Sequence, residues 1–185
     1  QLPYCIIDII GIKVCLSIKY CTLKNNVSEK VLESNDFLVV GNTAYEFYTF
    51  KKDVADKYAE IINKARNKLP SNVRVFDILV PTAIDITLAR SVRDKYNTDD
   101  QKEAIGYIYG KIADSVNKVE VYDTLRHNRD EYLYFRTDHH YTSRGAWYAY
   151  TCFCDAAGIK AADLGLYTGN VPELLRLVLF QDGSI

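Results

Sequence analysis

Apolar residues recur at helical and at strand-like intervals in alternating stretches of the chain. The clearest helix runs from Lys51 to Leu69, where apolar side chains return every three or four positions and Pro70 closes the segment. Val73 to Val80 follows as a nearly continuous apolar strand, which is typical of a strand covered on both faces. The run Thr98-Asp99-Asp100-Gln101 fits a capping box and predicts a helix to about Val116.

Shorter patterns predict several further elements. The β-branched stretch over residues 4–21 predicts one or two strands, with Gly11 as a turn. Phe37 to Val40 predicts a strand, Gly41-Asn42 a turn, and Ala44 to Phe50 a second hairpin arm. The remaining expectations are a helical segment over residues 84–96, short strands over residues 119–122 and 132–135, and a helix that ends at Gly158.

The order of these elements predicts the fold class. Strands that alternate with helices favour an α/β fold with a mainly parallel sheet and right-handed crossovers. A chain of 185 residues is expected to form one domain. Within residues 1–185 we expect N-terminal strands and a loop over residues 1–36, a core over residues 37–158, and an incomplete C-terminal part over residues 159–185.

Composition and charge narrow the class of partner. A net charge of −1 gives no electrostatic footprint for nucleic acid or an anionic membrane, so neither is expected as a partner. No apolar run approaches the length of a membrane span, and the sequence begins with Gln1. We therefore expect a soluble, processed or trimmed piece. The five cysteines contain no CxxC pair and are expected to be mostly buried small hydrophobes.

The candidate chemistry gathers in one stretch, residues 132–147. An aromatic strand pattern runs into Arg136, Thr137, Asp138 and His139, and Thr142 or Ser143 then offers an N-cap for the following helix. Two of the three histidines of the chain lie here. A strand that ends in a carboxylate and two imidazoles, just before a helix, commonly presents catalytic groups at a sheet edge.

Asp138 and His140 have the spacing of an acid–base pair. A histidine takes a proton from a hydroxyl near neutral pH, and a carboxylate two positions earlier can fix its tautomer and stabilise its protonated form. In an extended segment residues i and i+2 share a face, which pairs Asp138 with His140 and turns His139 away. The other interpretation is a structural histidine near a helix start.

A metal site at Asp138, His139 and His140 is the third interpretation of the same stretch. Adjacent histidines in an extended segment do not easily reach one ion, and the chain has no HExxH motif. Only His127 remains as a further histidine ligand. The sequence therefore predicts no metal and no other cofactor.

The run from Tyr134 to Thr142, with Gly145-Ala146 and the aromatic helix after it, resembles the DHHW protein family. That family in turn is similar to the SGNH-like domains of polysaccharide O-acetyltransferases, such as those that acetylate alginate. The resemblance spans about Val39 to Gly158. It implies a flavodoxin-like, SGNH-hydrolase-like α/β sandwich and a Ser-His-Asp triad, with Asp138 as the orienting carboxylate and His140 as the base.

Two neighbours of this pair are candidate substrate-binding residues. Tyr141 stands where the family usually has Trp and keeps an aromatic platform there. Arg136 meets an anionic group of the substrate or forms a salt bridge within the fold. The fifteen tyrosines, several of them near the motif, suit either sugar stacking or amphipathic core positions.

The resemblance places the nucleophilic serine after the Asp/His motif, at a strand-to-helix turn. Ser143 is too close in sequence to return to His140 and is expected to cap the helix. Ser184 follows the apolar run Leu174 to Phe180, but in the order Asp-Gly-Ser rather than Gly-Asp-Ser. A nucleophile beyond Ile185, or in a segment that this sequence does not contain, is therefore expected over Ser184.

Together with the Asp138–His140 spacing, the resemblance implies an esterase or O-acetyltransferase that acts on carbohydrate O-acetyl esters. The alternatives are a non-catalytic carbohydrate-binding or scaffold domain and a metal-dependent hydrolase. The resemblance implies an extracytoplasmic place, in the cell envelope or secreted, with any signal or anchor outside this chain. It also implies a polysaccharide or acetylated carbohydrate as partner, together with a membrane acyl-transfer partner, for a protein expected to be a monomer.

Overall fold

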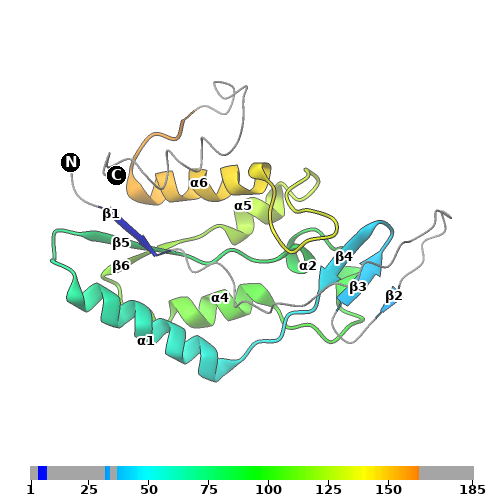
Figure 1. Cartoon of the computed structure of the whole chain (residues 1–185), viewed down its shortest axis with the longest axis horizontal. Helices are drawn as coiled ribbons and strands as arrows, with labels where there is room; N and C mark the ends of the chain where they lie inside the picture. Colours follow the sequence, from blue (N-terminus) through cyan, green and yellow to red (C-terminus); the bar gives the residue numbers. More distant parts are fainter. Residues whose placement is uncertain (1–3, 8–31, 34–36, 163–185) are drawn as a thin grey trace.

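Two three-stranded sheets and six helices make up the described part of the chain, residues 4–7, 32–33 and 37–162 of a computed structural model (Figure 1). The first sheet is parallel, in the order β1-β5-β6, and consists of β1 (Tyr4–Ile7), β5 (Arg74–Ile78) and β6 (Val116–Val119). The pairing aligns Ile6 with Phe76 and Phe76 with Asn117. The middle strand β5 therefore fixes the register of both neighbours.

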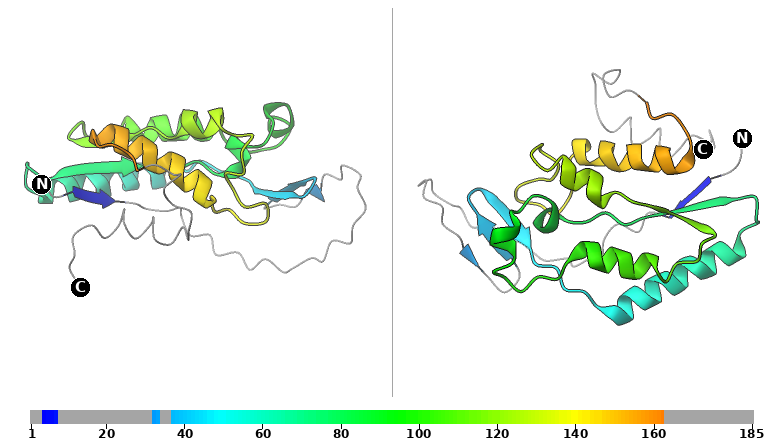
Figure 2. Two further views of the ribbon diagram at one scale, coloured as in Figure 1. Left: turned by 90° about the horizontal axis from the view of Figure 1, so that it is seen from above. Right: turned by 180° about the vertical axis from the view of Figure 1, so that it is seen from behind.

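The second sheet is antiparallel and holds β2 (Leu32–Glu33), β3 (Phe37–Val40) and β4 (Thr43–Glu46). Between β3 and β4 the turn uses Gly41 at φ 61°, a left-handed conformation that a residue without Cβ adopts at little cost. The predicted hairpin is therefore confirmed, although its second arm ends at Glu46. This sheet lies at the end of the molecule that is farther from the start of β5 (Figures 1 and 2). There its strand β4 contacts α2.

Helices cover both faces of the parallel sheet. Their bounds are α1 (Lys52–Lys68), α2 (Ala83–Ile86), α3 (Arg90–Arg93), α4 (Gln101–Tyr109), α5 (Tyr122–His127) and α6 (Ser143–Ala157). Figure 1 shows α1 and α4 on one side of β5 and β6, with α5 and α6 on the other. None of these helices is long and apolar enough to cross a membrane.

The core follows from the alternation of side chains along β5. Val75 and Phe76 are both fully buried but point to opposite faces, as successive strand residues must. Val75 packs with Ala59 and Ile62 of α1, while Phe76 meets Phe153 of α6 edge-to-face at 5.1 Å between ring centroids. A strand buried on both faces explains the continuous apolar run in the sequence.

The structure corrects three of the predicted boundaries. The helix expected to reach Val116 ends at Tyr109, and Val116 is instead the first residue of β6. The strand expected over residues 119–122 therefore ends at Val119, and Tyr122 instead begins α5. The helical segment expected over residues 84–96 is split into α2 and α3.

The coarse prediction of an α/β fold is confirmed by the mixed strands and helices. Its finer part, a flavodoxin-like or SGNH-like sandwich around a mainly parallel central sheet, stays a prediction, as does the division into three parts along the chain. The Gly11 turn, the apolar run over residues 172–179 and Ser184 lie outside the described residues.

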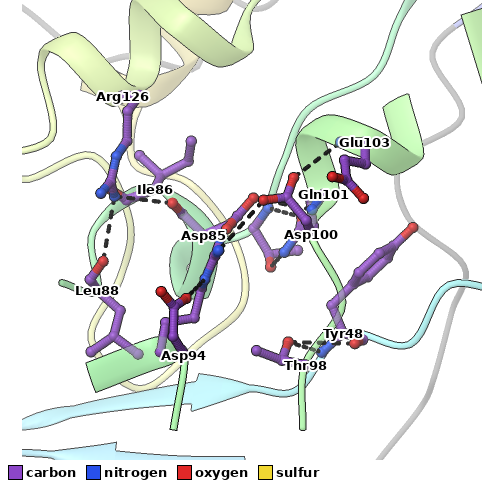
Figure 3. Close-up of polar contacts among 12 residues, drawn as sticks. Tyr48, Asp85, Ile86, Leu88, Asp94, Thr98, Asp100, Gln101, Glu103 and Arg126 are labelled. Atoms are coloured by element: carbon purple, nitrogen blue, oxygen red, sulfur yellow. Dashed lines mark hydrogen bonds and ion pairs between the residues drawn. The ribbon is translucent and has the colours of Figure 1, made fainter. Parts of the chain in front are cut away.

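A buried polar network joins the helices that follow β5 (Figure 3). Asp85 of α2 is 2% exposed and accepts hydrogen bonds from the backbone N–H of Gln101 at 3.1 Å and the hydroxyl of Tyr122 at 2.9 Å. Its other oxygen is paired with the guanidinium of Arg93. One carboxylate thus ties α2 to α3, to the first turn of α4 and to α5.

The backbone carbonyls of α2 are satisfied from α5. Arg126 donates from Nη1 to the carbonyls of Asp85, at 3.0 Å, and of Ile86 (Figure 3). Burial and the nearby Arg129 lower the pKa of the Arg126 guanidinium. These bonds hold the connection between β5 and α4, and this connection contacts the loop between α5 and α6 through Pro81 and Tyr134.

Candidate active site

The candidate motif lies on a tight loop between α5 and α6, drawn in yellow in Figure 1. We call residues 134–141 the motif loop. Tyr134 and Tyr141 form an isolated antiparallel bridge, and the N–H of Phe135 donates to the carbonyl of His140 at 3.1 Å. The strand predicted over residues 132–135 is therefore wrong. The chain folds back on itself there and leaves the polar residues 136–140 at the tip.

Two contacts fix the motif loop to the fold, and a third joins the residues that flank it. The N–H of Ala44, in β4, donates to the carbonyl of Arg136 at 2.7 Å. The buried hydroxyl of Tyr134 donates to the carbonyl of Pro81 at 2.6 Å, and burial raises the pKa of this phenol. The hydroxyl of Thr142 donates to the carbonyl of Tyr132 at 2.6 Å. The tip is thus tied to the small sheet and to the segment after β5.

Helix α6 starts where the sequence predicts. Thr142 is the N-cap and its hydroxyl accepts from the N–H of Gly145, while Gly158 ends the helix at φ 69° in the left-handed region. Glu131, before the loop, binds the guanidinium of Arg144 and accepts from the hydroxyl of Tyr148 at 2.6 Å. The Arg144 hydrogen bond is the main reason that the pKa of Glu131 is lowered.

Gly145 is the position where the motif loop and α6 pack most closely. A Cβ there would lie 2.5 Å from the carbonyl oxygen of Leu133 and 2.9 Å from the Cβ of Tyr141. We expect Gly145→Ala to destabilise the protein by about 1–3 kcal/mol, because backbone atoms cannot move aside as a flexible side chain can. Urea unfolding measures the change. Gly106→Ala on the exposed side of α4, where a Cβ meets nothing within 4 Å, is the control and should be neutral or stabilising.

Asp138 and His140 are brought together at the tip. Asp138 Oδ1 accepts from the backbone N–H of His140 at 2.8 Å and contacts Nδ1 of the same residue. The hydrogen bond from the His140 backbone is the main cause that lowers the pKa of Asp138, and the ring contact lowers it further. The carboxylate therefore stays charged at a lower pH than an ordinary aspartate does. Both side chains are about half exposed. Since Nδ1 faces the carboxylate, Nε2 of His140 remains for a reacting group.

His139 does not face away, contrary to the expectation from an extended segment. Its ring lies against that of His140, with centroids 4.1 Å apart and planes at 33°. Its Nδ1 is 3.6 Å from Oε1 of Glu46, at the end of β4. The turn at the tip removes the strand alternation on which the expectation depended. Among the described residues, Asp138, His139 and His140 form one group whose possible metal-ligand atoms lie within 4.8 Å of one another.

The two candidate substrate residues differ in their surroundings. Arg136 is exposed and stacks over the ring of Tyr132 at 5.5 Å, and in the described part of the chain it pairs with no carboxylate. Tyr141 is half-buried against the core, so it supports the loop more than it offers a surface. The sequence placed Tyr132 near the motif, with stacking or a core position both open, and gave no role to Phe135. The structure shows the two as an exposed pair, in edge-to-face contact at 6.1 Å.

A pocket of about 110 Å³ lies beside these aromatic residues. Its lining joins the motif loop to β4, to α2 and to the segment before the loop: Thr43, Tyr45, Ala83, Thr87, Arg129, Glu131, Tyr132, Leu133, Tyr134, Phe135 and Arg136. Asp138 and His140 are not part of the lining. The pocket is therefore lined by the first residues of the motif loop and does not enclose the Asp138–His140 pair.

No serine of the described residues is hydrogen-bonded to His140. Ser143 is the first residue of α6, next to the N-cap Thr142. Ser184 lies outside the described residues. The geometry therefore holds two members of a possible triad, an imidazole and a carboxylate.

Comparison with known proteins gives a family and two similar structures. The pattern of the family described as DHHW protein matches residues 8–170. A crystal structure of a DHHW family protein from Eubacterium siraeum is 32% identical with a TM-score of 0.68, over 75% of this chain and 45% of that one. No curated protein matches.

A second solved structure is more distant in sequence. Bacillus cereus PatB1, solved with a sulfonyl adduct, is 20% identical with a TM-score of 0.58, over 77% of this chain and 48% of its own. The chain thus spans less than half the length of either solved protein. At that identity the likeness to PatB1 concerns the fold. The family pattern covers most of the chain, and the chain belongs to the DHHW protein family.

Proposed function

We propose that this protein is an SGNH-like esterase or O-acetyltransferase that acts on carbohydrate O-acetyl esters by Ser-His-Asp chemistry. The observation that carries the proposal is the pairing of Asp138 with Nδ1 of His140 at the tip of a loop that is bonded to β4 and to the segment after β5. An exposed imidazole held by a carboxylate is the arrangement of a general base. Membership of the DHHW family and the likeness to PatB1 agree with it.

The proposed reaction has two steps. Nε2 of His140 takes the proton of a serine hydroxyl as its oxygen attacks the acetyl carbonyl, and Asp138 stabilises the imidazolium that forms. Backbone N–H groups hold the oxyanion until the C–O bond to the sugar breaks and the imidazolium returns the proton to the leaving oxygen. Water, or a second sugar hydroxyl, then attacks the acetyl-enzyme by the same path, which releases acetate or the new ester.

The serine belongs to a part of the protein outside the described residues. Ser184 is one possibility; a serine elsewhere outside the described residues, or beyond Ile185 in a protein of the length of its structural neighbours, is the other. A serine hydroxyl that approaches Nε2 of His140 from the exposed side of the motif loop leaves Asp138 in place, because Asp138 contacts Nδ1. A place in the cell envelope or outside the cell, a membrane acyl-transfer partner and a monomeric state are part of the proposal.

The exposed residues Tyr132, Phe135 and Arg136 support a carbohydrate substrate, and we call them the aromatic face. Two half-exposed rings and a guanidinium without a carboxylate partner among the described residues offer stacking and charge beside the pocket. Arg136 is proposed to meet an anionic or polar group of the sugar. Tyr141 is proposed to support the loop beneath the substrate, since it is half-buried.

Covalent labelling of the full-length protein tests the function. A fluorophosphonate or sulfonyl fluoride reacts with an activated serine, and peptide mass mapping locates the adduct. We expect one modified serine, whose position shows whether it is Ser184 or another residue. A folded full-length protein that forms no serine adduct would contradict the esterase proposal.

A non-catalytic carbohydrate-binding module is the second candidate function, favoured by the aromatic face. Both functions predict that Tyr132→Ala weakens binding of an acetylated polysaccharide by roughly tenfold, which corresponds to about 1.4 kcal/mol. Affinity electrophoresis or calorimetry measures the change. Ile61→Ala, at an exposed position on α1, is the control and should bind as wild type does. Binding together with no serine adduct would favour the module over the enzyme.

A further inference from the structure

We propose that the tip of the motif loop binds one Zn²⁺ ion through Asp138, His139 and His140. Glu46 of β4 is the fourth ligand. In an extended segment neighbouring imidazoles diverge, and for that reason the sequence predicts no metal there. The described loop is a turn instead, and the two imidazoles stack at 4.1 Å between centroids.

The ligand atoms lie near the separations of a small tetrahedral ion and reach them by side-chain shifts. Zn²⁺ holds nitrogen and oxygen ligands at about 2.0–2.2 Å, which places neighbouring ligands about 3.4 Å apart. His139 Nδ1 and Glu46 Oε1 are already 3.6 Å apart. The ligand atoms of Asp138, His139 and His140 lie within 4.8 Å of one another, while Glu46 lies outside this group of three and has to move towards it to complete the site. All four side chains are about half exposed, so that shifts of about 1 Å meet little packing resistance.

In each histidine, Nδ1 is the ring nitrogen beside a carboxylate. His139 Nδ1 faces Glu46, and His140 Nδ1 faces Asp138. Two neutral imidazoles and two carboxylates form an N₂O₂ set with a charge that matches a divalent cation. An ion that enters between the two pairs replaces the contact between Asp138 and His140 by two metal–ligand bonds.

Both ligand-bearing segments are fixed to each other before an ion binds. The N–H of Ala44 in β4 donates to the carbonyl of Arg136 at 2.7 Å, and Phe135 is bonded to His140 across the loop. Glu46 therefore stays beside the tip although it is far from the motif in sequence. Such preorganisation lowers the ordering cost of a metal site.

Metal bound at Nδ1 of His140 has a consequence for the proposed reaction. A neutral imidazole that coordinates through Nδ1 carries its proton on Nε2, so that Nε2 can no longer accept the proton of the serine. Zn²⁺ would act as a reversible inhibitor. Only this consequence rests on the proposed function, because the ion site is defined by its ligands alone.

Titration with zinc chloride tests the site in the full-length protein. We expect saturable binding of one Zn²⁺ per chain by calorimetry, weakened at least tenfold by His139→Ala and measurably by Glu46→Gln. His127→Ala on α5 and Glu60→Gln on the exposed side of α1 are the matched controls, and both should bind as wild type does. No saturable binding, or binding that His139→Ala leaves unchanged, would overturn the proposal.

Two further measurements separate this site from other ligands and from the enzyme function. The absorption of bound Co²⁺ should lack a thiolate charge-transfer band, and such a band would assign the ion to cysteines and overturn the proposal. Zn²⁺ should also slow labelling by the fluorophosphonate, and EDTA should restore it. Zinc binding at His139 without any serine labelling would support the ion site and contradict the esterase instead.

Discussion

His140→Ala is expected to lower acetyl-ester turnover by about 10⁴-fold while the protein stays folded, because removal of the base leaves the serine hydroxyl protonated. The side chain is about half exposed and supports no core contact, so its loss should not change the unfolding midpoint. Release of nitrophenol from 4-nitrophenyl acetate measures the rate, and urea unfolding measures stability. His127→Ala is the matched control, since it removes the histidine of α5 outside the motif loop.

Asp138→Asn distinguishes a catalytic pair from a structural contact. The amide keeps the size of the carboxylate, but it can no longer stabilise an imidazolium or favour the productive tautomer, so a loss of about 10³–10⁴-fold is expected. Both changes together should cost little more than His140→Ala alone, because the two residues act as a unit. Turnover by His140→Ala that equals wild type would refute the assignment of the base.

Asp85→Ala is expected to destabilise the fold by about 3–5 kcal/mol, because it leaves the buried partners of the carboxylate without their acceptor. The Arg93 side chain is only 12% exposed, and the hydroxyl of Tyr122 loses a bond of 2.9 Å. The N–H of Gln101 at the start of α4 loses its bond as well. For a chain of this size the melting temperature should fall by roughly 6–20 °C, which thermal unfolding followed by circular dichroism measures.

Asp94→Ala is the control for this prediction. Asp94 also pairs with Arg93, at 3.1 Å, but its side chain is 60% exposed, so we expect a change of no more than about 0.5 kcal/mol. Equal effects of the two substitutions would show that burial of Asp85 does not govern the stability of this region. The rate of serine labelling per folded molecule should be unchanged in Asp94→Ala.

The Asp138–His140 pairing could be predicted from the sequence, whereas the buried role of Asp85 could not. Asp138 and His140 are two positions apart, and their pairing was predicted from that spacing, although the reason given, an extended strand, is wrong. The role of Asp85 was not foreseen. The sequence signal for it is a single carboxylate within the apolar run Ala83 to Ile86, a pattern that indicates a buried charge with partners elsewhere in the chain.

By itself the sequence determined the elements whose causes are local. The helix over Lys52–Lys68, the hairpin turn at Gly41, and the start and end of α6 at Thr142 and Gly158 follow from apolar spacing and from capping or turn residues within a few positions. The assignment to an α/β class followed from the order of such elements.

Tertiary structure alone decided the features that join distant segments. Residues 134–141 form a closed loop where the sequence predicts a strand at Tyr132–Phe135, and Glu46 lies beside His139. The aromatic face is exposed. Asp85 is surrounded by Arg93, Gln101 and Tyr122. Hydrophobic periodicity records which face of an element is buried, but it does not record which element lies opposite. Those contacts depend on how β4 and α5 meet α2 beyond the carboxyl end of β5, and they form only when the chain is packed.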